Sequence, residues 1–179
     1  MYKRQGLKEI DIREGAILEK GCVYIIPLME SLNLPDHISA ASNAKSSIGR
    51  LDLLTRVITD NGIEFDRINN GYNGPLYAEI CPRSFSVLVK PKQRLNQIRF
   101  RIGQAIISDA DLTTMHLKDP LVNGNALIDD GLGFSVDLKP KENNLVGYVA
   151  KPHTDIIDLE KINYYNPNDF WQSLEASSG

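Results

Sequence analysis

The stretch NGPLYAEI, residues 73–80, gives the clearest strand signal of the chain. In an extended chain Leu76, Ala78 and Ile80 lie on one face and Glu79 lies on the other, because successive side chains of a strand point to opposite sides. The Asn-Gly-Pro sequence before them is a turn signal. The stretch therefore predicts a β-strand that buries one apolar face and carries a carboxylate on the opposite face.

Similar short runs recur on both sides of this stretch, with Gly, Asn, Asp and Pro marking turns between them. Many short strands with frequent turns are typical of a sandwich or barrel-like β fold. Pro27 closes the first run. The further predicted strands are 22–26, 53–59, 85–89, 95–102, 133–138 and 145–150, and the predicted helices are 46–51, 108–117 and one that starts at Asn168 and runs through Trp171.

The overall composition excludes several classes of protein. A chain of 179 residues suffices for about one domain with a sizeable core. It has 42% hydrophobic and 24% charged residues, as globular proteins do, and no apolar run reaches the ~20 residues that a membrane helix needs. A net charge of −3 argues against binding along a nucleic-acid backbone. Cys22 and Cys81 show no CxxC spacing, which favours reduced thiols in the cytoplasm. We therefore expect neither a membrane nor a nucleic acid as a partner.

The two ends of the chain carry an expectation about its origin. The opening residues, MYKRQ, resemble a translated sequencing adapter, so we expect residues 1–6 to be an artefact or a linker. The chain stops soon after the helix start predicted at Asn168, which favours a fragment of a longer protein.

Lys45, Ser46, Ser47 and Arg50 form the first candidate functional cluster. If Ser46 caps the predicted helix, the free N–H groups after it can bind an anion. Arg50 follows Ser46 by four positions, so it lies on the same helix face. The arrangement suits a phosphate or the polar edge of a base. The alternative is an ordinary N-cap followed by a surface arginine.

Glu79 is the second candidate, because it lies in an otherwise apolar strand. A carboxylate among aromatic and apolar neighbours can act as a general base or acid. The alternative is a glutamate on the wet face of an antiparallel strand.

A bias in charge is the third feature. Residues 80–108 contain no acidic side chain, but they contain six basic ones. This indicates either a local positive field near a phosphorylated ligand or a solvated basic face. His37, His116 and His153 have no metal-ligand spacing, and the zinc nucleoside-deaminase signature is absent from the sequence. No phosphate-binding P-loop or dinucleotide fingerprint occurs either.

Four motifs occur in an order that resembles the dCTP deaminases of the dUTPase-like superfamily, and in particular their long, internally duplicated bacterial form. These motifs are KSSIGRL at 45–51, RINNGYNG at 67–74, LYAE at 76–79 and RLNQIRF at 94–100. The resemblance extends over about residues 7–172.

The resemblance implies a mainly β fold, a distorted jelly-roll (β-clip) with a few short helices. It implies a homotrimer with active sites between subunits. We accordingly expect a β-clip domain over 7–128, and over 129–179 a β extension that begins the connection to a second domain.

The resemblance also implies a reaction, in which dCTP and water give dUTP and ammonia without a catalytic metal. The product would supply dUMP for thymidylate synthesis, in some members after the same enzyme has cleaved dUTP to dUMP. Glu79 matches the general base and acid of the family, and Ser46 and Arg50 match residues that position the water and stabilise charge. Mg²⁺ would be bound only with the substrate triphosphate.

The remaining site residues are implied to bind substrate. Lys45 and Ser47 match phosphate contacts, as does Arg67. Thr59 matches a position whose backbone meets the cytosine edge, and Gln97 matches a polar residue beside the nucleotide.

The sequence departs from the family pattern at one notable position. Asn69 replaces an acidic residue expected near the sugar, and Asp66 could substitute for it. Two alternatives stay open. One is a dUTP diphosphatase, in which an aspartate and Mg²⁺ would activate water for attack at phosphorus. The other is a non-catalytic half of a duplicated chain, with a structural or nucleotide-sensing role.

Overall fold

The computed structural model describes residues 9–103, 106–140 and 142–176, so the artefact or linker predicted at 1–6 lies outside the described residues. Its contacts divide the chain into two units. Unit 1 is Met1–Arg101 with Tyr148–Gln172, and unit 2 is Ile102–Gly147 with Ser173–Gly179. The division into 1–6, 7–128 and 129–179 stays a prediction.

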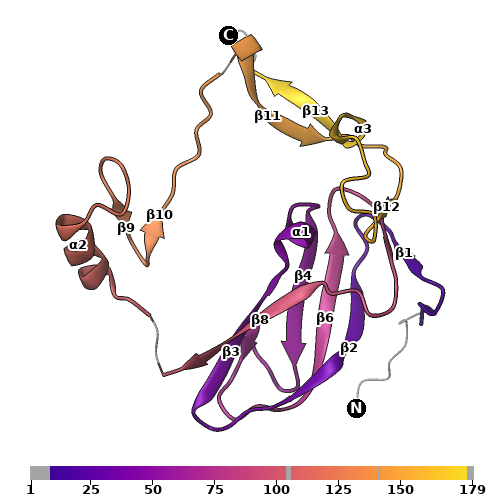
Figure 1. Ribbon diagram of the computed structural model, residues 1–179, viewed down its shortest axis with the longest axis horizontal. Helices are drawn as coiled ribbons and strands as arrows, with labels where there is room; N and C mark the ends of the chain where they lie inside the picture. Colours follow the sequence, from indigo (N-terminus) through magenta and orange to yellow (C-terminus); the bar gives the residue numbers. More distant parts are fainter. Residues whose placement is uncertain (1–8, 104–105, 141, 177–179) are drawn as a thin grey trace. The chain divides into compact units, whose positions relative to one another are not determined.

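Strands predominate among the described residues, and the helices are short (Figure 1). The strands are β1 (Ala16–Leu18), β2 (Tyr24–Asn33), β3 (Ile38–Ala44), β4 (Leu53–Thr59), β5 (Arg67–Ile68), β6 (Asn73–Pro82), β7 (Val87–Val89), β8 (Asn96–Ile102), β9 (Leu127–Ile128), β10 (Leu132–Gly133), β11 (Leu145–Ala150), β12 (Ile157–Asp158) and β13 (Trp171–Glu175). The helices are α1 (Ser46–Gly49), α2 (Asp109–Lys118), α3 (Pro167–Phe170) and the 3₁₀ turn η1 (Glu142–Asn144). The predicted mainly β class with a few short helices is confirmed. In the described part of the chain no helix is long and apolar enough to cross a bilayer.

Unit 1 is built on three three-stranded sheets. Their strand orders are β1-β7-β12, β2-β6-β4 and β5-β3-β8, and β12 runs parallel to β7. In the second sheet, β6 lies between β2 and β4, and the three strands can be followed side by side in Figure 1. Two-stranded sheets join β9 to β10 and β11 to β13. The strand predicted at 76–80 is therefore the central strand of its sheet.

The alternation predicted for β6 is present in the structure. Leu76, Ala78 and Ile80 are buried, whereas Glu79 lies on the opposite face. The strand predicted at 53–59 has the same bounds as β4, and its odd-numbered residues are buried. Burial of the apolar face explains both strands, because an alternating pattern buries its hydrophobic side chains only in an extended chain.

The core of unit 1 combines residues from both ends of the chain. The side chain of Phe85 meets those of Phe170 and Trp171 edge to face, at ring-centroid distances of 5.5 and 5.2 Å. Residues 148–172 are thus part of this core, although about fifty residues of unit 2 separate them from the rest of unit 1. The buried cluster consists of Leu18, Ile48, Leu53, Ala78, Ile80, Phe85, Val87, Val89, Ile157 and Phe170.

Pro27 does not end a strand, contrary to the prediction. It lies within β2, paired with Tyr77, and the register of the two strands shifts between Pro27 and Ser31. Among the described residues β2 pairs with β6 alone, and an edge strand tolerates a proline because one of its sides needs no N–H donors. The prediction that Pro27 closes the strand is therefore wrong.

Other local predictions also differ from the structure. Lys45, not Ser46, is the N-cap of α1, and its side chain caps nothing. Trp171 has extended backbone angles and begins β13, so the helix predicted to run through it ends at Phe170. The strand predicted at 133–138 is limited to the Leu132–Gly133 pair, and Phe134 and Val136 are exposed. Trp171 became part of a strand because β13, which it begins, pairs with β11, and the residues after Gly133 form no strand because they have no pairing partner among the described residues.

Candidate active site

Glu79 forms an ion pair with Arg56 of the neighbouring strand. The two residues lie opposite each other in the antiparallel register of β6 and β4. Both Nε and Nη2 of Arg56 donate hydrogen bonds to Oε1 of Glu79, the former at 3.1 Å. The Glu79 side chain is only 18% exposed and that of Arg56 is 35% exposed. The carboxylate is therefore held by an ion pair in a partly dehydrated setting.

Aromatic and apolar side chains surround this pair. The guanidinium carbon of Arg56 lies 3.7 Å from the centroid of the Phe65 ring, a cation–π contact. On the other side of β6, Ile25 of β2 is the cross-strand partner of Glu79. The outer face of the sheet thus places one ion pair among apolar neighbours.

The predicted cluster at 45–50 lies on and around α1. Ile48 anchors the helix in the core, and the Lys45 N–H donates to the Leu95 carbonyl at 2.9 Å. Ser46, Ser47 and Arg50 are exposed. Because Ile48 is buried in a helix of only four residues, the polar residues on either side of it point away from the core. Their hydroxyl and guanidinium groups are free to meet a ligand.

Three of these residues line a cavity of about 900 Å³ in unit 1, namely Lys45, Ser47 and Arg50. The wall also holds Lys92, Arg94 and Lys161, so five basic side chains line one cavity, against the two acidic side chains of Asp158 and Glu160. Its size falls within the range of small-ligand sites. A positively charged cavity of this volume suits a nucleoside phosphate.

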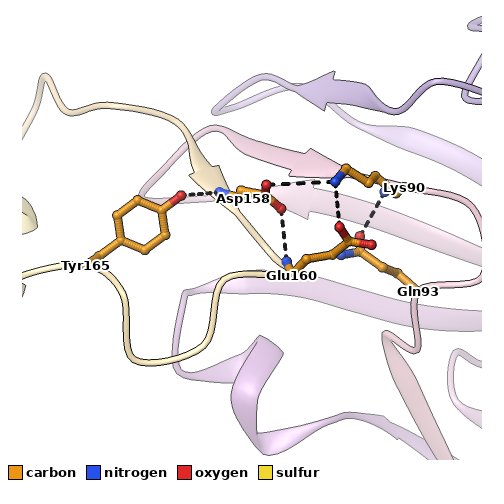
Figure 2. A network of polar contacts seen from close by, with 5 residues as sticks. All are labelled: Lys90, Gln93, Asp158, Glu160 and Tyr165. Atoms are coloured by element: carbon orange, nitrogen blue, oxygen red, sulfur yellow. Dashed lines mark hydrogen bonds and ion pairs between the residues drawn. The ribbon is translucent and has the colours of Figure 1, made fainter.

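The two acidic residues of the cavity wall, Asp158 and Glu160, take part in a network of polar contacts (Figure 2). Lys90 Nζ lies 2.5 Å from a Glu160 carboxylate oxygen and 4.0 Å from one of Asp158. The Asp158 N–H donates to the Tyr165 hydroxyl oxygen at 2.7 Å, and the Lys90 N–H donates to the Gln93 amide oxygen at 2.9 Å. The hydrogen bond to Glu160 raises the pKa of Lys90. The network joins the segment at and after β12 to the end of β7, and the single charge of Lys90 offsets one of the two negative charges near the cavity.

The other predicted residues lie elsewhere in unit 1. Thr59 ends β4 with a buried side chain, and its carbonyl accepts the Gly62 N–H at 3.1 Å. Arg67 is exposed on β5 and its Nη1 donates to Glu64 at 3.0 Å. Gln97 of β8 lines a different cavity, of about 560 Å³. The structure therefore does not gather these three residues around the α1 cavity.

A single chain also keeps Glu79 apart from the α1 cluster. Ile48 of α1 belongs to the same buried cluster as Ala78 and Ile80, whereas Glu79 lies on the opposite face of β6. Among the described residues, no hydrogen bond or ion pair joins Glu79 to Ser46 or Arg50. One chain thus presents two separate sets of site residues, the carboxylate on one face of the sheet and the basic cavity on the other side.

Sequence reasoning missed the immediate neighbours of Glu79. Arg56 and Phe65 do not belong to any of the four motifs, and Lys161 lies far along the chain from α1. A signal for Arg56 did exist, because it is the one charged residue within the apolar alternation of residues 53–59. The sequence carries no comparable signal for the register that places it opposite Glu79.

The fold and these two sets of residues define a mainly β protein with a carboxylate–arginine pair and a basic cavity of nucleotide size. Two family models match the chain. The 2'-deoxycytidine 5'-triphosphate deaminase N-terminal domain matches residues 2–104, and the 2'-deoxycytidine 5'-triphosphate deaminase C-terminal domain matches residues 108–179. The chain belongs to the dCTP deaminase family.

A solved structure agrees with this assignment. The crystal structure of 2'-deoxycytidine 5'-triphosphate deaminase from Agrobacterium tumefaciens is 49% identical to the chain, with a TM-score of 0.83. The match covers 96% of this chain and 52% of that chain, so the sequence spans about half the length of this relative. A search among curated proteins found no match.

Proposed function

We propose that this chain forms part of a hydrolase that converts dCTP and water to dUTP and ammonia. The observation that carries the proposal is the match of the two deaminase domain models to almost the whole chain. The relative from Agrobacterium tumefaciens, whose name states that activity, supports it at 49% identity. The product would supply dUMP, either through a separate diphosphatase or through cleavage by the same enzyme.

Glu79 is the general base in this proposal. Its carboxylate takes a proton from water, and the water oxygen bonds to C4 of cytosine to give a tetrahedral centre. The C4–N4 bond then breaks, the proton held by Glu79 leaves with the amino nitrogen as ammonia, and the remaining hydroxyl proton passes to N3, which gives the C4 carbonyl and the N3–H of uracil. Ser46 positions the water, and Arg50 stabilises the charge that develops at the tetrahedral carbon. Activation of the water thus falls to a carboxylate rather than to a metal ion.

The basic cavity beside α1 is the proposed triphosphate site. Lys45 and Ser47 bind phosphate oxygens there, and Mg²⁺ enters as the counter-ion of the substrate. Arg67, Thr59 and Gln97 lie outside this cavity in the same chain, and in this proposal they reach the phosphates and the base at a site shared with a neighbouring chain. The cluster of basic side chains around the cavity supports this assignment, because phosphate oxygens favour lysine and arginine.

Self-association is part of the proposal, with a homotrimer as the assembly. The separation of Glu79 from Ser46 and Arg50 within one chain supports a site shared between chains. The apolar side chains that remain exposed around Glu79 support an interface there, because exposed apolar patches often mark contact surfaces. They include Ile25, Leu54 and Phe65, exposed by 51%, 39% and 45%. Glu79 of one chain would then meet Arg50 of the next.

Two variants and their mixture test the proposed site in the full-length protein. We expect Glu79→Gln to lower the rate of ammonia release from dCTP by roughly 10²–10⁴-fold, because it removes the base. Arg50→Ala should lower kcat more than it raises KM, because its role lies in the transition state. The two inactive variants, unfolded and refolded together, should regain part of the activity. Chromatography of the nucleotides identifies the product, with dCTP, CTP, dCMP and dUTP offered separately.

The control for this experiment is Arg13→Ala, which removes an exposed pair between Arg13 and Asp11, two residues that line neither cavity. It should leave the rate unchanged. Ammonia release by Glu79→Gln at the wild-type rate would eliminate Glu79 as the base. Consumption of dUTP alone, with pyrophosphate as product, would favour a dUTP diphosphatase. Inactive variants that do not complement each other would argue against a site shared between chains.

A further inference from the structure

The contact between Arg56 and Glu79 has an asymmetry that bears on catalysis. Both donors of the guanidinium, Nε and Nη2, reach the same carboxylate oxygen, Oε1. Among the described residues, no hydrogen bond reaches the second oxygen, Oε2. The arginine thus occupies one oxygen of the carboxylate and leaves the other available to a third group.

Two neighbouring residues restrain the arginine itself. The Phe65 ring lies against the guanidinium at 3.7 Å from its centroid. The loop that carries Phe65 is fastened to β4 beside Arg56, because the Val57 N–H donates to Asp66 Oδ1 at 2.8 Å and the Asp66 N–H donates to the Val57 carbonyl at 2.9 Å. The side chain of Arg56 therefore has a strand beneath it and an aromatic ring against it, which reduces the conformations open to it.

We propose that Arg56 is a positioning residue that binds Oε1 of Glu79 and thereby directs Oε2 toward the water that is to be activated. The inference rests on the proposed role of Glu79 as the general base. Phe65 contributes by holding the guanidinium in the plane in which both of its donors meet Oε1. Neither residue touches the substrate in this scheme; each acts through the orientation of the Glu79 carboxylate.

Proton transfer depends on how the Glu79 carboxylate is aligned with the water. A glutamate side chain has three rotatable bonds, and a base that abstracts a proton must lie within hydrogen-bond reach of the water in the right direction. Two donors on one oxygen restrain the position of that oxygen more tightly than a single lysine ammonium would, and they leave Oε2 outside the ion pair. Loss of the arginine should therefore affect the chemical step rather than substrate binding.

The first test examines the contact without reference to activity. In ¹H–¹⁵N spectra of the purified protein, the Arg56 Nε–H signal, assigned by its loss in Arg56→Lys, should shift when Glu79 is changed to Gln. It should not shift in Asp11→Asn, which disturbs a separate arginine pair. An Arg56 Nε–H signal that is insensitive to Glu79→Gln would show that the pair does not form in solution, and the inference would be abandoned.

The second test measures kinetics with dCTP in the full-length protein. We expect Arg56→Ala to lower kcat by roughly 100-fold, the size of effect that a misplacement of about 1 Å produces, with little change in KM. Arg56→Lys should recover only part of kcat, because it keeps the charge but loses the two-donor geometry. Added guanidinium, well below denaturing concentration, should raise kcat of Arg56→Ala and leave that of Glu79→Gln unchanged. Arg13→Ala serves as the matched control.

The outcomes separate this inference from the proposed function. If Glu79→Gln is inactive while Arg56→Ala keeps the wild-type kcat, the base is confirmed and the positioning role is wrong. If Arg56→Ala raises KM alone, Arg56 binds substrate instead of orienting Glu79. If Glu79→Gln turns over dCTP at the wild-type rate, the proposed reaction stands, but Glu79 is not its base and the positioning role of Arg56 is wrong as well. A thermal unfolding curve of Arg56→Ala that matches wild type assigns its kinetic loss to the site and not to the fold.

Discussion

Two carboxylates that contact β4, those of Glu79 and Asp66, have different surroundings, and the difference determines what each can do. Glu79 is paired with the Arg56 guanidinium on the outer face of the sheet. Asp66 is turned toward the backbone, where its Oδ1 accepts the Val57 N–H at 2.8 Å. Burial raises the pKa of Asp66, and this effect outweighs the opposing hydrogen bond from Val57 and the charge of Arg56. Asp66 thus has a structural role in the β4 connection, whatever role it has near a sugar.

The raised pKa of Asp66 gives a prediction about pH. A folded carboxyl with a raised pKa holds its proton longer than the unfolded chain does, so the free energy of unfolding falls as pH rises from the ordinary aspartate pKa to the raised one. Asp66→Asn keeps an oxygen for the Val57 N–H but cannot ionise. Urea unfolding from acid to neutral pH should therefore show wild type losing stability relative to Asp66→Asn as pH rises. A gain of the wild type with rising pH would contradict the assignment.

Among the helices and strands, some are explained by their local sequence and others by the residues that they pack against. β4 and β6 follow from their alternation, and Ser108, the first residue of the predicted helix, is the N-cap of α2, its Oγ accepting the Asp111 N–H at 3.2 Å. α1 lacks a side-chain cap although two serines stand at its start, and it depends on burial of Ile48 instead. An alternating pattern is sufficient to predict a strand when it repeats along the whole strand. The four-residue helix α1 instead depends on the burial of one residue, Ile48.

The cap of α2 can be tested on its own. None of the residues of α2 is buried, so the helix gains little from packing and depends on its ends. Ser108→Ala should destabilise it by about 1 kcal/mol, seen as roughly fivefold faster amide exchange in residues 109–118. Ser108→Asn, which retains a capping oxygen, should exchange nearly as slowly as wild type. Equal exchange in the alanine and asparagine variants would show that the cap is not what stabilises α2.

For unit 1 as a whole, residues 148–172, which come late in the sequence, are part of the core. The second family match begins at residue 108, yet residues 148–172 within it pack in the same unit as residues from the first match. Phe170 is 5% exposed and meets Phe85, one of the most buried residues, edge to face. Domain boundaries drawn along the sequence therefore do not coincide with the compact units.

This packing predicts a large effect for one substitution. Phe170→Ala should lower the free energy of unfolding by about 3–5 kcal/mol, because it leaves a cavity against Phe85. Ile162→Ala, at a position in the same segment that is 84% exposed, should change it by less than about 0.5 kcal/mol. Urea unfolding measures both. A small effect of Phe170→Ala would mean that residues 148–172 are not integral to the core of unit 1.

The sequence by itself determined the mainly β class, the strands β4 and β6, the face on which Glu79 lies and the helix α2. Each of these depends on residues within a few positions of one another, where periodicity and capping act. Only the tertiary structure decided that Arg56 faces Glu79, that Lys161 joins the cavity beside α1, and that Phe170 packs on Phe85. These contacts join residues that are distant in the sequence, and their register is fixed by the burial of the whole core rather than by any local pattern.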